Sequence, residues 1–226
     1  MVNAFEGNKA ETSTMIPTLT AFMAAHGLTD VVVVADAGMV SEANQRAIEA
    51  AGLSFILGAK TPKVPYVIEA WHTAHPDEEV EDGQVFVQPW PAGPTDNRRD
   101  QTIYYAYSAD RARRTLRGIS EQVRKAEDAV AGKTTVKRNR FVTLTGASKS
   151  VNRDLETKAR ALAGIKGYIT NLPDPTPEFV IGAYHRLFQI EKSFRMAKSD
   201  LAARPIYART RDNIEAVTSD EFMRFL

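Results

Sequence analysis

The sequence of 226 residues contains no cysteine, which excludes disulfide bonds, thiolate nucleophiles and cysteine-based zinc sites. The lack of cysteine also suits a protein of the reducing cytosol. No apolar stretch is long enough to span a bilayer. Residues 1–8 have neither the basic start nor the apolar centre of a signal peptide. We therefore expect a cytoplasmic protein that has no membrane partner.

Several common catalytic patterns are missing as well, including a glycine-rich phosphate loop and a Ser-His-Asp arrangement. The four histidines, His26, His72, His75 and His185, are scattered along the chain. His72 and His75 share a segment rich in proline and acidic residues, where they could bind a metal ion or simply be surface residues. An unrelated metal-dependent α/β hydrolase therefore stays open as one class of function.

The whole chain has no excess of one charge sign, because 29 lysines and arginines face 28 acidic residues, a net charge of +1. The distribution is uneven. Residues 66–97 contain seven acidic residues and no lysine or arginine, whereas residues 98–140 contain twelve basic and five acidic residues. A basic segment in a near-neutral chain fits an anionic polymer such as a nucleic acid, but solvated charged helices have the same composition.

What is present indicates an α/β core. The pattern predicts a helix over 14–25, an apolar β-branched strand over 31–35, a helix over 42–51 capped by Ser41, and a second strand over 55–57. This strand–helix–strand order is typical of a βαβ unit with parallel strands. A return strand over 167–172 and a final helix from Thr176 to about residue 199 complete the predicted core.

Prolines and short alternating segments between the two parts of the core predict a largely β insertion. The elements expected there are strands at 84–88, 102–107 and 140–144, a long charged helix over 109–131 and a short helix over 154–163. The predicted organisation is a first part of the core at 1–60, the insertion at 61–166, the last core strand and helix at 167–215, and an atypical tail at 216–226.

Two distant segments indicate chemistry. The apolar strand ends on Asp36, which is the usual way to place a carboxylate at the tip of a buried strand. Tyr184, Glu191 and Lys198 are spaced by seven residues, so they lie nearly in line on one face of a helix. Taken alone, neither residue indicates a catalytic site, because a strand-end Asp often caps a helix and a helical Glu is usually solvated. Together they suggest a metal-dependent phosphoryl-transfer site.

These same segments resemble the DDE transposases of bacterial insertion sequences, within the insertion-sequence-four superfamily. Residues 33–41 look like the block around that family's second catalytic Asp. Residues 184–198 resemble its signature of Tyr, two residues, Arg, three residues, Glu, six residues and Lys. Residues 5–11 and 204–212 look like blocks that border the catalytic core. The resemblance therefore extends over nearly the whole chain.

The register of the signature fits at three of its four positions, which are Tyr184, Glu191 and Lys198. The arginine position holds Leu187. Arg186 lies one residue early, and Arg195 follows Glu191 by one helical turn, so either arginine could supply the guanidinium.

The resemblance implies a ribonuclease-H-like fold in which three carboxylates hold two Mg²⁺ ions for an in-line displacement at phosphorus. It implies that Asp36 and Glu191 are catalytic residues and metal ligands. It also implies that Tyr184, Arg186, Arg195 and Lys198 bind DNA. The expected partner is the DNA of the terminal inverted repeats, with a homodimer assembled on two ends. The basic helix offers a second DNA contact through Arg111, Arg113, Arg114, Arg117 and Arg124.

The family's first catalytic Asp should lie on a strand upstream of residues 5–11, and the chain starts at about that point. We therefore expect an incomplete core, with its early strands missing and the chain truncated at both ends. Two hypotheses follow. The chain is either the greater part of a transposase catalytic domain, or an inactive remnant that at most binds DNA or a full-length transposase.

Overall fold

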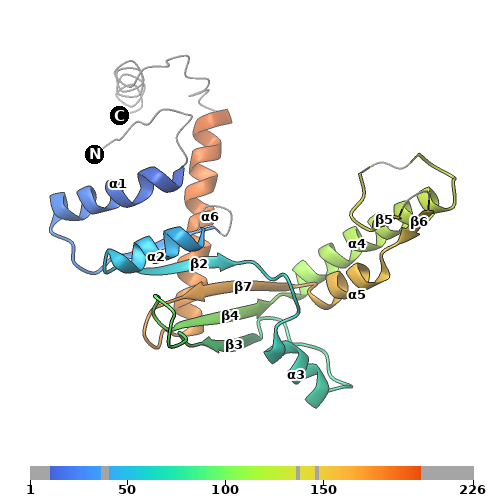
Figure 1. The fold of residues 1–226 in the computed structure, drawn as a ribbon, viewed down its shortest axis with the longest axis horizontal. Helices are drawn as coiled ribbons and strands as arrows, with labels where there is room; N and C mark the ends of the chain where they lie inside the picture. The colour runs from blue at the N-terminus through green and yellow to red at the C-terminus, as the bar shows by residue number, and fades with distance from the viewer. Residues whose placement is uncertain (1–10, 37–40, 136–137, 146–147, 200–226) are drawn as a thin grey trace. The chain divides into compact units, whose positions relative to one another are not determined.

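The computed structural model describes residues 11–36, 41–135, 138–145 and 148–199, and at 11–14, 190, 191 and 193–199 it describes the backbone alone. The described residues form a mixed α/β structure (Figure 1). They divide into two units by their contacts. The first unit takes its described residues from Met1–Gly58, Trp90–Thr102 and Tyr168–Leu226, and the second takes them from Ala59–Pro89 and Ile103–Gly167.

The strands that the sequence predicts are all present. Five strands form one sheet in the order β1-β2-β7-β4-β3, and two more form the antiparallel pair β5-β6. Among them, β6 is the strand that the sequence did not predict. The strands are β1 Val32–Ala35, β2 Ser54–Ala59, β3 Val85–Trp90, β4 Gln101–Tyr107, β5 Val142–Thr145, β6 Ser148–Val151 and β7 Ile165–Thr170.

The predicted βαβ unit of the first unit is confirmed. Strands β1 and β2 are parallel, with Val34 opposite Ile56, and α2, Glu42–Ala50, connects them. The Ser41 hydroxyl accepts a hydrogen bond of 3.3 Å from the Asn44 backbone N–H, which is the predicted N-cap. Phe55 and Ile56 are fully buried, as expected for an apolar parallel strand.

Buried polar groups lock β2 and α2 to the end of β7. The Thr170 hydroxyl donates to the Phe55 carbonyl at 2.6 Å, and the Phe55 N–H donates to Oδ1 of Asn171 at 2.8 Å. The Asn171 amide in turn donates to Oε1 of Glu49 on α2 at 3.0 Å. Because Thr170 and Asn171 are 0% and 4% exposed, these partners spare them the cost of unpaired burial.

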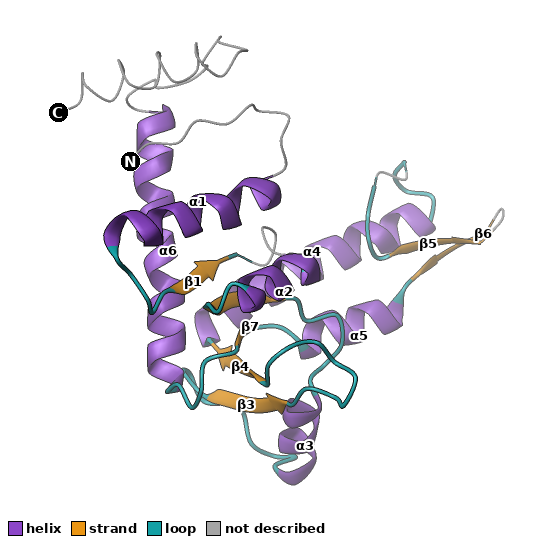
Figure 2. Ribbon diagram, turned by 60° about the vertical axis from the view of Figure 1, so that its left-hand side comes forward, coloured by secondary structure: helices purple, strands orange, loops and turns teal. Residues whose placement is uncertain are grey.

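The last described helix, α6, Pro177–Ser199, begins as the sequence predicts. The Thr176 hydroxyl accepts from the Phe179 backbone N–H at 3.2 Å, and proline occupies the first helical position. Helix α6 packs against β1, and Figure 2 shows the two elements beside each other. The buried residues Val180 and Tyr184, one turn apart, lie on α6. Helix α1, Glu11–His26, packs against α2.

The second unit contains more helix than the sequence indicated. Its helices are α3 Tyr66–Ala74, α4 Ala109–Val130 and α5 Arg153–Ala161. The sequence predicted α4 and α5 but missed α3. Prolines surround α3 and predict a break in regular structure, yet Pro65 stands at its N-cap, where a missing N–H has no cost. Ile68 on α3 is fully buried.

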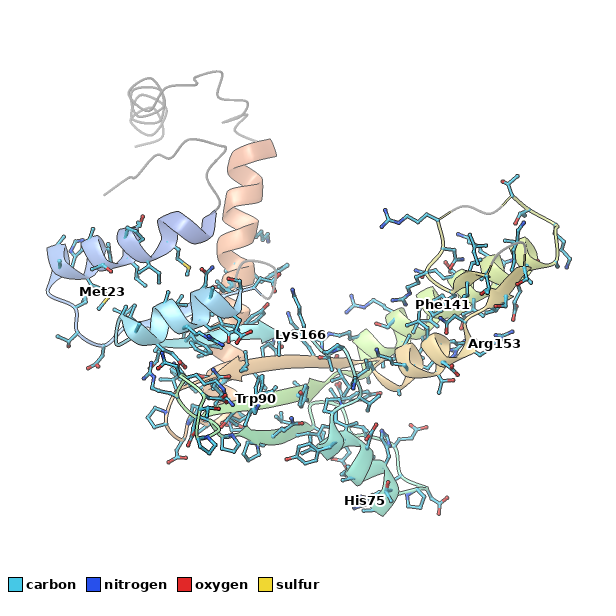
Figure 3. The ribbon with its side chains drawn as sticks, viewed as in Figure 1. Met23, His75, Trp90, Phe141, Arg153 and Lys166 are labelled. Atoms are coloured by element: carbon cyan, nitrogen blue, oxygen red, sulfur yellow. The ribbon has the colours of Figure 1, made fainter. Side chains whose placement is uncertain are left out.

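Helix α4 packs against β6 and α5 through a small apolar core. Ile119, Val123 and Ala126 lie on one face of α4 and cluster with Phe141, which is 0% exposed. Figure 3 labels Phe141. The opposite face of α4 is charged and exposed. No helix in the part of the chain that the structure describes is long and apolar enough to cross a membrane.

Candidate active site

Asp36 directly follows β1, so the carboxylate stands at the carboxyl end of a parallel strand, as the sequence indicated. The residue before it, Ala35, is 6% exposed, whereas Asp36 itself is exposed. Backbone pairing with β2 holds the strand as far as Ala35, which faces Leu57. The carboxylate is therefore carried by a rigid element and remains accessible to a ligand.

Tyr184 on α6 connects to this carboxylate. Its hydroxyl donates a hydrogen bond to Oδ1 of Asp36, across a separation of 148 residues in the sequence. Tyr184 is 6% exposed. Because α6 packs against β1, two segments that are far apart in the chain and that carry the proposed chemistry meet at this bond.

The aromatic ring of Tyr184 is itself held in place. It packs edge-on against Tyr168 of β7, with ring centroids 4.9 Å apart and an interplanar angle of 70°. Tyr168 is fully buried, and its hydroxyl lies 3.4 Å from Nε2 of His185. Edge-to-face pairs of this kind are favourable beyond the area that they bury. A tyrosine cluster thus supports the hydroxyl that reaches Asp36.

The other predicted site residues lie on the same helix. Arg186 is exposed on α6. Glu191, Arg195 and Lys198 also belong to α6 by their backbone, but their side chains lie outside what the structure describes. The structure therefore brings Asp36 and Tyr184 together, and it leaves the roles predicted for the other four residues as predictions.

The arginines of α4 differ in their surroundings. Arg111 donates to the Gly164 carbonyl at 3.2 Å, Arg113 pairs with Asp110, and Arg114 donates to the Asp110 carbonyl at 3.3 Å. Two more, Arg117 and Arg124, are exposed, and no ion pair joins them to a carboxylate within the described ranges. The guanidinium groups of these two arginines have no described partner within the protein and are therefore available to an external anion.

His72 and His75, the histidines on which a metal-dependent hydrolase stayed open, pack around one tryptophan. His75 stacks on Trp71 at 4.9 Å and its Nδ1 lies 2.9 Å from the Trp71 carbonyl. His72 meets the same ring edge-on at 5.1 Å. Among the residues with described side chains, no group of three histidine or acidic residues is arranged to hold a metal ion.

The described carboxylate has the chemistry of a ligand for a divalent metal ion. Asp36 supplies hard oxygen ligands, which Mg²⁺ prefers, and it is exposed at the end of a fixed strand. A carboxylate has about four lone-pair sites, so a hydrogen bond at one oxygen is compatible with coordination. Asp36 therefore fits such an ion. A Glu on α6, the helix that packs on β1, would be the second ligand.

The first unit has a shallow hollow whose charged lining residues make contacts that stabilise the fold. It is lined in part by Arg46, Glu49, Asp96 and Arg98. A hydrogen bond from the Gly93 backbone N–H, followed by the attraction of Arg98, holds the pKa of Asp96 below its usual value. Arg98 also lies over the Trp90 ring and donates to the Trp90 carbonyl at 3.0 Å. The contacts of Asp96 and Arg98 hold the loop that contains them against Trp90 and Gly93.

Sequence reasoning missed the supporting residues of the site. Tyr168 belongs to no motif, His185 is not one of the four signature positions, and the family resemblance implies a DNA contact for Tyr184. Strand pattern and helix pattern separately predict β7 and α6, but they do not reveal that a β7 side chain packs on an α6 side chain. The available signal was the burial expected for an aromatic residue one turn after Val180.

The comparison with protein families identifies the family of the chain. The model of the transposase DDE domain family matches residues 2–217, which is nearly the whole chain. The chain therefore belongs to the transposase DDE domain family. No curated protein matches the chain, and no solved structure matches it.

Proposed function

We propose that this protein carries out metal-dependent cleavage and strand transfer of DNA at transposon ends, on a ribonuclease-H-like core. Membership of the transposase DDE domain family supports DNA transposition as the process. The observation that carries the finer proposal is the hydrogen bond between Tyr184 and Asp36. It joins the segment that resembles the family's second catalytic Asp to the helix that bears its Tyr-Arg-Glu-Lys signature.

In this proposal Asp36 and Glu191 are the catalytic carboxylates of the chain and would hold a divalent ion, which such transposases normally use and which we propose is Mg²⁺. When bound, the ion supplies an activated oxygen nucleophile and stabilises the charge that develops on the leaving oxygen. The protein contributes by fixing the positions of these two carboxylates. Strand β1 fixes Asp36, and α6 carries Glu191 on a helix that packs against that strand.

The DNA partner would be the terminal inverted repeats of the element. Arg186, Arg195 and Lys198 follow one another along α6 and would bind phosphates near the scissile bond. A guanidinium can contact a phosphate with two parallel hydrogen bonds, whereas an ammonium acts as a point charge. We further propose that two copies assemble on two ends, which the mass of the protein–DNA complex would test.

The first experiment is to sequence the DNA on both sides of the reading frame and to identify the inverted repeats. A duplex that carries these repeats is then the substrate for the purified protein with Mg²⁺. We expect Asp36→Asn and Glu191→Gln each to abolish cleavage, because each removes a charged ligand. The variants should bind the duplex as well as the wild type or better, since a negative charge near phosphates is lost.

Matched controls are Asp30→Asn, an exposed acid just before β1, and Glu178→Gln, an exposed acid in the first turn of α6. Both should cleave at the wild-type rate. Substantial residual cutting by Asp36→Asn or Glu191→Gln would show that the catalytic assignment is wrong. If the wild-type protein binds the repeats and never cuts them, the alternative of an inactive DNA-binding remnant is the correct one.

A further inference from the structure

The environment of Tyr184 conflicts with a direct role in binding DNA. The side chain is 6% exposed, its ring packs on Tyr168, and its hydroxyl donates to Asp36. The exposed side chains on this part of α6 are others, such as Arg186 and Phe188, the latter 64% exposed. A buried tyrosine whose hydroxyl is engaged would have to leave its packing before it could reach a phosphate.

We infer that Tyr184 is a positioning residue that orients the Asp36 carboxylate for metal binding. This inference rests on the proposed function, because it concerns the same metal site. The χ2 torsion of aspartate is broad, so a carboxylate at the end of a strand turns freely unless a partner fixes it. A hydrogen bond from a hydroxyl to an ionised carboxylate is stronger than one between neutral groups. It holds Oδ1 and so sets the plane of the carboxylate.

The hydroxyl can act in this way because its own position is set by three elements. Tyr184 lies on α6, α6 packs against β1, and the ring rests against the fully buried Tyr168 of β7. The aromatic ring is rigid, and this packing restricts both torsions of the side chain. The strand fixes the Cα of Asp36, and the tyrosine holds its Oδ1.

The test measures Mn²⁺ affinity of the full chain by electron paramagnetic resonance titration, without DNA. Partners that orient a metal ligand typically change affinity 10- to 100-fold when they are removed. We therefore expect Tyr184→Phe to weaken Mn²⁺ binding by at least about tenfold. The matched control is Tyr105→Phe, which removes the hydroxyl of an equally buried tyrosine on β4 that lies outside this cluster. That variant should bind Mn²⁺ like the wild type.

A double variant separates positioning from a general loss of structure. If Tyr184 acts through Asp36, then Tyr184→Phe should have no further effect on Mn²⁺ affinity once Asp36→Asn is present. Additive losses, or a Tyr184→Phe protein that has lost the wild-type circular dichroism, would overturn the inference. A second readout is DNA affinity in the absence of metal, which Tyr184→Phe should leave unchanged. A loss of that affinity would show that Tyr184 contacts DNA instead.

The remaining outcomes distinguish this inference from the proposed function. If Asp36→Asn weakens Mn²⁺ binding and Tyr184→Phe does not, the inference is wrong and the proposed metal site stands. If Asp36→Asn has no effect, or the wild-type chain does not bind Mn²⁺, Asp36 is not a metal ligand. Both proposals then fail together.

Discussion

Gly164 occupies a position at which backbone and surroundings both require the absence of a side chain. Its φ is 86°, and an added Cβ would lie 2.6 Å from Cε2 of Tyr107 and 2.8 Å from Cβ of Ala112. We predict that Gly164→Ala loses about 1–3 kcal/mol of unfolding free energy from overpacking. A left-handed backbone adds about 1–2 kcal/mol to this loss. Urea denaturation would measure the total.

The control for this prediction is Gly83→Ala, because Gly83 has the same φ of 86° and no described atom within 4 Å of its added Cβ. That variant should show the backbone cost alone. Equal losses for the two variants would mean that Tyr107 moves aside easily and that the contact at Gly164 is not limiting. A glycine after a helix is a recognisable turn signal in a sequence, but its contact with Tyr107 follows only from the tertiary structure.

At the scale of elements, α4 and α5 are joined by a network of charges. Arg153, which is labelled in Figure 3, donates to Glu127 of α4 at 2.6 Å and to Glu156 at 2.7 Å. Arg160 donates to Glu156 at 2.9 Å. The hydrogen bond from Arg153, and then that from Arg160, lowers the pKa of the Glu156 carboxyl below its ordinary value of 4.5. The bond to Glu156, and then that to Glu127, raises the pKa of Arg153.

The depressed pKa gives a prediction with a defined sign. A carboxylate with a lower pKa in the folded state stabilises the protein above its unfolded pKa and loses that effect as pH falls through the folded value. Between about pH 5 and 3, the melting temperature of Glu156→Gln should therefore fall less than that of the wild type. The control is Glu121→Gln, an exposed acid of α4. A parallel fall for wild type and Glu156→Gln would contradict the network's role.

The elements show what sequence patterns can and cannot predict. The caps at Ser41 and Thr176 and the apolar strand that precedes Asp36 are local signals, so the βαβ unit and α6 were predictable. Helix α3 was missed because its flanking prolines outweighed a short amphipathic pattern. The bond between Tyr184 and Asp36 was not predictable, since it depends on how α6 packs against β1.

At the scale of the whole molecule, a net charge of +1 means that affinity for DNA has to come from the distribution of charge. Arg117 and Arg124 are exposed α4 arginines that have neither a hydrogen bond nor an ion pair within the described ranges. We predict that replacing both by alanine weakens DNA binding and reduces the slope of log K against log salt by about 2, one for each lost phosphate contact. Fluorescence anisotropy over a series of salt concentrations would measure this slope.

The matched control is Arg113→Ala, because Arg113 is already paired with Asp110. Its salt slope should stay close to that of the wild type. An unchanged slope for the double variant would mean that α4 is a solvated charged face, the reading that composition left open. Charge counts alone could not separate these readings, since they do not show which arginines are paired within the protein.

The first unit is built from segments that leave the ribosome at very different times. Asp36 is synthesised 148 residues before Tyr184, the residue that donates to it. At about 5–20 residues per second, this interval is roughly 7 to 30 seconds. During that time β1 and β2 exist without the helix that later packs on β1. The hydrogen bond at Asp36 forms only after α6 has emerged, so the proposed site gains its geometry roughly 7 to 30 seconds after Asp36 itself is made.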